Sequence, residues 1–175
     1  MFKRLLPDQI VNTVYDIDLD EWSAQGVRGI ITDLDNTLVS ARTPLATPEL
    51  IQWLDRVHDR GFKVVILSNN NSRRVAKFAE PLGLPYIPAA RKPAGAAFRQ
   101  ALQQLGLAPQ QVVVVGDQLM TDVLGGHRAG LKAILVTPIA RSEEGWRTRI
   151  NRVIEKVALS RLRKQGLWPK DKGGR

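Results

Sequence analysis

The sequence predicts an α/β fold of three layers, in which helices cover both faces of a parallel sheet. Two observations predict it. Short runs rich in valine and isoleucine alternate with longer amphipathic segments from residue 27 onward, a pattern typical of parallel strands joined by right-handed helical crossovers. The chain also has 175 residues, enough for one domain with a sizeable hydrophobic core.

Four apolar runs are expected to form strands that are buried on both faces. They comprise residues 27–32, 62–67, 111–115 and 131–136. Residues 85–88 are a candidate for a further short strand. Because both faces of these strands are apolar, helices must cover the sheet on both sides.

Amphipathic segments between these runs predict four helices. The first is capped by Thr47, has Pro48 at its first position and ends at Gly61. Its expected apolar face consists of residues at helical spacing: Leu50, Ile51, Leu54 and Val57. The other three are expected to begin at Asn71 or Ser72, at Pro93 and at Leu119, and to end near Leu82, Gly106 and Ala129.

Positive charge is concentrated near the end of the chain. Of a formal net charge of +9, residues 141–175 contribute +7, from 11 Lys/Arg against 4 Asp/Glu. A basic segment favours phosphate-bearing partners such as lipid headgroups or nucleic acid, although a solvated helix face has the same composition. We therefore divide the chain into residues 1–140, a single domain with an N-terminal extension at 1–26, and residues 141–175, a basic amphipathic helix and tail.

The basic segment also carries an apolar stripe at helical spacing. The stripe consists of Trp146, Ile150, Val153, Ile154, Val157 and Ala158. Two interpretations are open: an accessory helix that packs on the domain, or an interfacial helix that lies on anionic lipid.

The chain contains no cysteine. This excludes a disulfide framework, a thiolate zinc site and a cysteine nucleophile, so a metal would be bound mainly by oxygen atoms. No apolar run approaches the roughly 18 residues of a membrane-spanning helix, and Pro7 and Asp8 interrupt the apolar start of the chain. We therefore expect a cytoplasmic protein without a secretory signal.

Polar residues follow the predicted strands at the points where the strands end. In α/β sheets the ligand crevice lies at these carboxyl ends. Each group alone could be a turn or a helix cap, but their occurrence after successive strands favours a shared site. The groups are Asp33 and Asp35, residues 68–70, residues 91–93, and Gly116 with Asp117.

The same groups resemble the four motifs of the haloacid dehalogenase superfamily of phosphohydrolases. They are DLDNT at 33–37, SNN at 68–70, RKP at 91–93 and GDQLMTD at 116–122. SNN and GDQLMTDVLGG are more narrowly similar to the YqeG-like subclass IIIA group, which also contains phosphatidylglycerophosphate phosphatases. The resemblance implies a Rossmann-like core.

His127 stands where that group is expected to have asparagine, and we expect a half-exposed helix residue there.

The resemblance implies that Asp33 is the nucleophile and forms an aspartyl-phosphate intermediate. Asp35 would then act as the general acid and base, protonating the leaving oxygen and deprotonating the hydrolytic water. This second aspartate favours phosphatase over dehalogenase chemistry, because a halide leaving group needs no proton.

The resemblance further implies a Mg²⁺ ion, which prefers oxygen ligands. Its protein ligands would be the Asp33 carboxylate, the Asp35 backbone carbonyl and the Asp117 carboxylate. Phosphate binding would fall to the second and third motifs, through Ser68, Asn69 and Lys92. Supporting roles are implied for Thr37 and Asn69 in holding the loops, and for Asp122 in orienting Lys92 or a metal-bound water.

Neither segment that could hold a cap domain has room for one, since residues 39–46 and 71–90 are short. An open cleft suits a bulky or membrane-anchored substrate, or a partner subunit that acts as the lid. Together with the basic segment 141–175 and the family resemblance, this favours phosphatidylglycerophosphate, hydrolysed to phosphatidylglycerol at the inner membrane face. Two alternatives are open: a phosphatase of a soluble nucleotide or sugar phosphate, and a non-enzymatic module that binds RNA or the ribosome.

Overall fold

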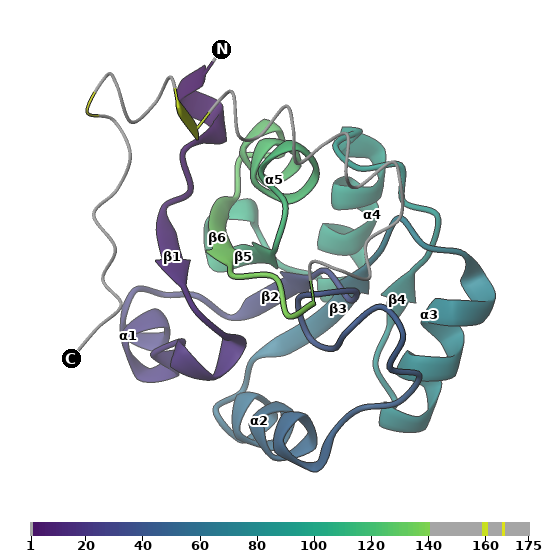
Figure 1. The fold of residues 1–175 in the computed structure, drawn as a ribbon. Coiled ribbons are helices and arrows are strands. Elements are labelled where there is room, and N and C mark those ends of the chain that lie inside the picture. The colour runs from purple at the N-terminus through teal and green to yellow at the C-terminus, as the bar shows by residue number, and fades with distance from the viewer. Residues whose placement is uncertain (1, 141–158, 161–165, 167–175) are drawn as a thin grey trace.

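The computed structural model describes residues 2–140, 159–160 and 166. Its centre is a six-stranded sheet in the order β1-β6-β5-β2-β3-β4, in which all neighbouring strands are parallel (Figure 1). The strands are β1 (Gln9–Val11), β2 (Gly29–Thr32), β3 (Lys63–Leu67), β4 (Tyr86–Ile87), β5 (Val112–Gly116) and β6 (Lys132–Val136). The predicted parallel α/β fold is confirmed.

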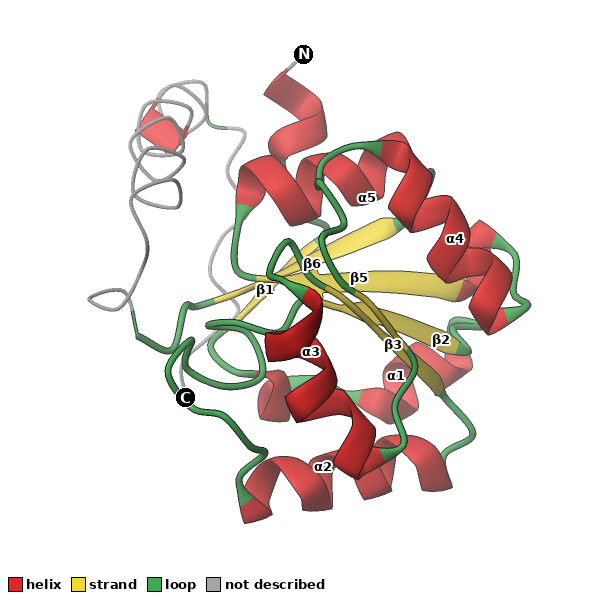
Figure 2. Cartoon of the chain, turned by 90° about the vertical axis from the view of Figure 1, so that its right-hand side faces the viewer, coloured by secondary structure: helices red, strands yellow, loops and turns green. Residues whose placement is uncertain are grey.

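Helices cover both faces of the sheet, with α4 and α5 on one side and α1 and α2 on the other (Figure 2). Their bounds are α1 (Leu19–Ala24), α2 (Pro48–Asp59), α3 (Ser72–Ala79), α4 (Gly95–Leu105) and α5 (Leu124–Arg128). Short 3-10 helices lie at Phe2–Leu5, Val14–Asp16, Glu80–Leu82 and Pro109–Gln111, and a π-helical turn at Leu119–Val123.

Side chains of β5 alternate between the two faces, as expected for a central strand. Val113 and Val115 pack with α1, α2 and α3, whereas Val112 and Val114 pack with α4. A third apolar cluster includes Leu5, Val123 and Ala133, and Leu159 packs against it. Of the predicted helix and tail at 141–175, the structure describes residues 159, 160 and 166; the rest lies outside the described residues.

Helix α2 begins as predicted, because the Thr47 hydroxyl accepts a hydrogen bond from the Leu50 N–H at 3.2 Å. The prediction for Ile51 was wrong, since this residue is 41% exposed while Trp53 is 2% exposed. Trp53 lies three residues after Leu50 and four before Val57, so these three residues form the buried stripe.

Two other helices differ from prediction at their beginnings. The helix expected from Pro93 begins at Gly95, and the helix expected from Leu119 divides into the π-helical turn and α5. The additional strand β1 has three residues and pairs with β6 at the edge of the sheet. A run this short gives no recognisable period in the sequence.

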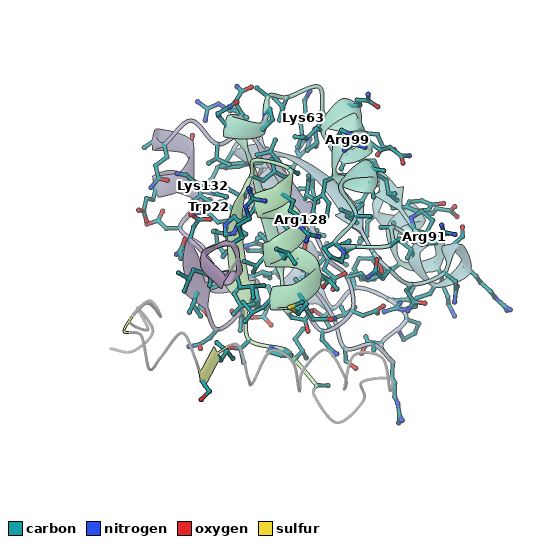
Figure 3. All side chains as sticks on the ribbon, turned by 90° about the horizontal axis from the view of Figure 1, so that it is seen from above. Trp22, Lys63, Arg91, Arg99, Arg128 and Lys132 are labelled. Atoms are coloured by element: carbon teal, nitrogen blue, oxygen red, sulfur yellow. The ribbon has the colours of Figure 1, made fainter. Side chains whose placement is uncertain are left out.

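The segments that lack room for a cap contain none in the structure. A loop occupies residues 40–46, and the segment 71–90 contains α3, a 3-10 helix and β4. Within the described residues, no helix has both the length and the apolar character needed to span a membrane. Basic side chains are exposed on the α4 and α5 side of the molecule, among them Arg91, Arg99 and Arg128 (Figure 3). Lys132 is also exposed, but its Nζ atom donates to Gln25 Oε1 at 3.3 Å, on the α1 side of the sheet.

Candidate active site

The carboxyl ends of β2, β3 and β5 lie side by side, because Thr32 is in register with both Ile66 and Val115. The ladder continues one residue further, where the Asp33 N–H donates to the Val115 carbonyl at 2.9 Å. The polar groups that follow these strands therefore meet at one edge of the sheet, as predicted.

A tight loop after β2 separates Asp33 from Asp35. Asn36 has a left-handed φ of 67°, and its N–H donates to the Val39 carbonyl at 2.6 Å. The Asn36 carbonyl in turn accepts from the Ile139 N–H at 3.0 Å, which holds the segment after β6 against the loop. This geometry buries the Asp33 side chain and leaves that of Asp35 partly exposed.

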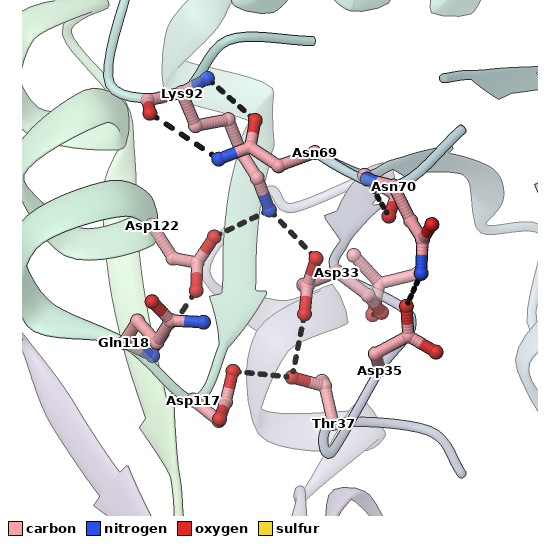
Figure 4. A network of polar contacts seen from close by, with 11 residues as sticks. Asp33, Asp35, Thr37, Asn69, Asn70, Lys92, Asp117, Gln118 and Asp122 are labelled. Atoms are coloured by element: carbon pink, nitrogen blue, oxygen red, sulfur yellow. Dashed lines mark hydrogen bonds and ion pairs between the residues drawn. The ribbon is translucent and has the colours of Figure 1, made fainter. Parts of the chain in front are cut away.

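Lys92 lies at the centre of the site, between two carboxylates (Figure 4). Its Nζ atom is 2.7 Å from Asp33 Oδ1 and 2.6 Å from Asp122 Oδ1. Burial alone would lower the pKa of Lys92, but the charges of Asp122 and Asp33 outweigh it, and the pKa is raised. The ammonium group is therefore charged at neutral pH.

Asp33 has an unusually high pKa for an aspartate. Burial raises the pKa of Asp33 to about 6, with Lys92 opposing the shift and Asp122 adding to it. The carboxylate is thus mostly ionised at neutral pH. It is buried, and its Oδ1 atom accepts a hydrogen bond from Lys92.

Asn69 fixes the backbone of Lys92. Its Oδ1 atom accepts from the Lys92 N–H at 2.7 Å, and its Nδ2 group donates to the Lys92 carbonyl at 3.3 Å. Both polar groups of the amide are thus engaged with the backbone. The side chain of Asn69 is consequently positioned to orient Lys92.

Asp122 packs directly over the end of β5. A Cβ atom at Gly116 would lie 2.3 Å from Asp122 Cγ, so only glycine fits beneath this carboxylate. Asp122 Oδ1 accepts from Lys92, and Oδ2 accepts from the Gln118 N–H at 3.1 Å. Both oxygens of Asp122 therefore have partners from the protein.

The carboxylates of Asp33, Asp117 and Asp122 are buried and offer oxygen atoms that lie within 4.8 Å of one another. Thr37 Oγ1 lies 3.4 Å from Asp33 Oδ2 and 3.5 Å from Asp117 Oδ1. Three carboxylates face the single ammonium of Lys92, and a divalent cation would balance their excess negative charge. Asp122 is bound by Lys92 at 2.6 Å and by the Gln118 N–H at 3.1 Å, whereas the contacts of Thr37 with Asp33 Oδ2 and Asp117 Oδ1 are longer, so Asp33 and Asp117 could hold such an ion.

The Asp35 carboxylate is held from the opposite side by Asn70 of the second motif and by Arg74, which the sequence did not indicate. Arg74 donates to Oδ1 through Nη2 at 2.9 Å and Nε at 3.2 Å, and Asn70 donates to Oδ2 through Nδ2 at 2.8 Å. Asn70 belongs to the second motif, but nothing in the sequence distinguishes Arg74 from its neighbour Arg73. Ser68, two residues before Asn70, is buried, and its Oγ atom accepts a hydrogen bond from the Asn70 N–H at 3.1 Å.

His127 lies at the other end of the sheet and is half-buried. Its Nδ1 atom is 2.7 Å from the Arg4 carbonyl, and its Nε2 atom is 2.9 Å from Asp8 Oδ2. The same Asp8 oxygen accepts from the Ala133 N–H at 2.7 Å. His127 therefore joins the start of the chain to α5 and β6, at the amino end of the strands.

The fold and the arrangement of Asp33, Lys92 and Asp117 define a hydrolase class. A family model described as haloacid dehalogenase-like hydrolase matches residues 18–130. The chain belongs to this family.

More specific similarity comes from three curated relatives. The chain is 50% identical to "Probable phosphatase YqeG" of Bacillus subtilis (strain 168), over 94% of this chain and 95% of the relative. It is 29% identical to "Phosphatidylglycerophosphate phosphatase 1, chloroplastic/mitochondrial" of Arabidopsis thaliana, over 95% of this chain and 51% of that protein. It is 26% identical to "Phosphatidylglycerophosphate phosphatase 1, chloroplastic" of Chlamydomonas reinhardtii, over 94% of this chain and 64% of that protein. The expected similarity to the YqeG-like group is confirmed, and the relatives support a phosphoric monoester hydrolase.

Solved structures agree with the fold. A HAD phosphatase from Thermococcus onnurineus has a TM-score of 0.54 at 16% identity, with 69% of this chain and 90% of that chain covered. An uncharacterized protein from Listeria monocytogenes serotype 4b has a TM-score of 0.55 at 20% identity, over 68% and 85% of the two chains. At these identities the similarity concerns the fold alone.

Proposed function

We propose that this protein is a Mg²⁺-dependent phosphatase that hydrolyses a phosphorylated lipid headgroup, phosphatidylglycerophosphate, to phosphatidylglycerol. The observation that carries the proposed chemistry is the buried Asp33 carboxylate, held 2.7 Å from the Lys92 ammonium and close to Asp117. The lipid substrate draws its support from the named relatives in Arabidopsis and Chlamydomonas, whose lengths this chain covers only to 51% and 64%.

In the proposed reaction, a carboxylate oxygen of Asp33 attacks phosphorus, and the bond from phosphorus to the leaving oxygen breaks. Lys92 neutralises charge around the nucleophile, and Lys92 and Ser68 supply donors for the transferring phosphoryl oxygens. Asn69 and Asp122 keep Lys92 in place through its backbone and its ammonium group.

Asp35 would supply a proton to the leaving oxygen and later take one from the water that splits the aspartyl-phosphate. It lies two residues from Asp33 on the partly exposed side of the loop, where a leaving group can reach it. Release from its bonds to Arg74 and Asn70 is necessary before it can act.

The proposed Mg²⁺ would be held by the Asp33 and Asp117 carboxylates and by the Asp35 backbone carbonyl. When bound, it would neutralise phosphoryl oxygens and compensate the excess negative charge of the three buried aspartates. Thr37, between Asp33 and Asp117, would support both ligands.

A cavity of about 320 Å³ adjoins the catalytic loop and supports an apolar substrate. It shares Thr37 and Val39 with that loop, and its other apolar lining includes Val14, Val136 and Ile139. Ile139 is 53% exposed. An acyl chain or glycerol backbone could occupy this space.

We also propose that residues 1–140 are the catalytic unit and that the basic segment 141–175 contacts anionic lipid. The charge of +7 on that segment supports this role. Cosedimentation with anionic liposomes at low and high salt tests it, and equal recovery with neutral vesicles would count against it.

The function is tested by phosphate release from phosphatidylglycerophosphate in mixed micelles and from soluble nucleotide and sugar phosphates, with Mg²⁺ or EDTA. We expect Mg²⁺-dependent hydrolysis of the lipid at the highest kcat/KM, and none by Asp33→Asn. Higher kcat/KM on a soluble phosphate would overturn the lipid assignment. RNA binding without any phosphate release would overturn the enzymatic one.

A further inference from the structure

The general acid and base proposed above is immobilised. Arg74 holds Asp35 Oδ1 with two N–H groups, and Asn70 holds Oδ2. The side chains of Arg74 and Asp35 are 14% and 18% exposed, so the pair is sheltered but in contact with solvent. In this arrangement Asp35 cannot turn to a leaving oxygen.

Arg74 itself is fixed in place on both sides. It lies in the first turn of α3, where its backbone N–H donates to Asn71 Oδ1 at 2.9 Å. Its Nη1 group donates to the Pro44 carbonyl at 3.3 Å, which holds the guanidinium against the loop that precedes α2. The guanidinium would therefore keep its position if Asp35 moved away.

We propose that Arg74 is the binding site for a second anionic group of the substrate, a phosphodiester close to the phosphomonoester that is hydrolysed. The phosphodiester replaces Asp35 on Arg74, and this exchange frees Asp35 for proton transfer. The inference rests on the proposed phosphatase function and adds the substrate class that the site selects.

The exchange replaces one anion by another on the same guanidinium. A planar guanidinium binds a phosphate as well as a carboxylate, because both offer two oxygens to its parallel N–H groups. The freed Asp35 can then turn to the leaving oxygen and take the proton-transfer role proposed above. A substrate without a second anion leaves Asp35 on Arg74 and reacts slowly.

The spacing of the two anions follows from the geometry. Asp35 contacts Arg74 in the resting site and the leaving oxygen during the reaction, each over one hydrogen bond of about 3 Å. The second anion takes the place that the Asp35 carboxylate leaves on Arg74, and that carboxylate needs only a side-chain rotation to meet the leaving oxygen. The second anion and the leaving oxygen therefore lie about 5–6 Å apart, a distance set by the short aspartate side chain and one hydrogen bond. A three-carbon spacer such as glycerol spans about this distance.

The test compares two soluble substrates that differ only in charge. One is the deacylated headgroup glycerophosphoglycerol phosphate, with a phosphodiester and a terminal phosphomonoester. The other is its methyl ester, in which the phosphodiester is a neutral triester. We expect wild-type kcat/KM to be about 30-fold higher for the charged substrate, the effect expected of an Arg–phosphate pair.

Variants assign this preference to Arg74. We expect Arg74→Gln to reduce the ratio to about 1–3, and Arg74→Lys to give an intermediate ratio. Arg73→Gln is the matched control, because Arg73 is exposed and adjacent on the same helix; it should keep the wild-type ratio. A purely structural role of Arg74 would lower both kcat/KM values equally and leave the ratio unchanged.

The inference is overturned by a wild-type ratio near 1, a measurement that needs no variant, or by an Arg74→Gln ratio equal to wild type. A sugar bisphosphate identifies the source of the anion: preference for it over the headgroup assigns the site to soluble bisphosphates, and the reverse assigns it to the lipid. Failure of the phosphatase function would appear differently, as no phosphate release from any monoester.

Discussion

Lys92 Nζ lies 2.7 Å from Asp33 Oδ1, and neither side chain is more than 9% exposed. This pair joins the residue after β2 to the residue before Pro93, 59 positions apart. The protein thus supplies a fixed positive charge beside a buried carboxylate whose pKa burial raises to about 6. Several measurable properties depend on this relationship.

Stability should reflect the ionisation of Asp33. Its folded pKa of about 6 exceeds its ordinary value of 3.8, so the folded protein binds more protons than the unfolded chain between these pH values. The free energy of unfolding therefore falls as pH rises through this window, by about 3 kcal/mol. In EDTA at pH 8, Asp33→Asn should be more stable to urea than wild type, and the gain should shrink toward pH 4. An equal difference at both pH values would contradict this.

Neutralising Asp122 should lower the pKa of Asp33 in the metal-free protein. The charge of Asp122 helps to keep that pKa high, so in EDTA the free energy of unfolding of Asp122→Asn should fall less between pH 4 and pH 8 than that of wild type. Urea denaturation at the two pH values measures this, and an equal or larger fall would show that Asp122 does not control the pKa of Asp33. With Mg²⁺ we also expect an activity loss of about tenfold, because Lys92 loses a charged partner.

Gly116→Ala should displace Asp122, because the new Cβ would lie 2.3 Å from its Cγ atom. We expect a loss of about 1–3 kcal/mol in unfolding free energy, the usual cost of overpacking, together with reduced activity. Gly95→Ala is the matched control: its Cβ would meet only the flexible Arg99 side chain, at 3.1 Å. Urea denaturation and phosphate release distinguish the two variants, and equal behaviour would contradict the proposed contact.

The apolar cavity should matter for lipid but not for soluble substrates. Ile139→Ser should reduce kcat/KM for micellar phosphatidylglycerophosphate about fivefold more than for the deacylated headgroup, since it removes apolar area at the cavity edge. Ile51→Ser is the control, because Ile51 is 41% exposed on α2 and does not line the cavity. If both variants affect the two substrates alike, the cavity does not receive the lipid.

The sequence predicted much of the fold because its strongest signals are local. Four runs of valine and isoleucine became β2, β3, β5 and β6, and polar residues at their ends marked the edge where the site lies. The edge strand β1 was missed because three residues give no period, and its pairing with β6 depends on a contact distant in sequence.

Long-range contacts also explain what was not predicted at the site. Arg73 and Arg74 are equivalent in sequence, and only the position of α3 beside the catalytic loop brings Arg74 to Asp35. Asn69 was expected to bind phosphate or support a loop; its amide contacts the Lys92 backbone, 23 residues away. The role of His127 likewise depends on Asp8, 119 residues away.

The central claim is that Asp33 forms a covalent bond to the transferred phosphoryl group. Rapid acid quench of the protein with Mg²⁺ and phosphatidylglycerophosphate, followed by borohydride reduction and peptide mass spectrometry, tests it most directly. The account predicts conversion of Asp33 to homoserine in wild type, because borohydride reduces the aspartyl-phosphate to an alcohol and releases the phosphate; Asp33→Asn should show no such conversion and should release no phosphate. Phosphate release at the wild-type rate by Asp33→Asn, or turnover with the modification on another residue, would contradict it.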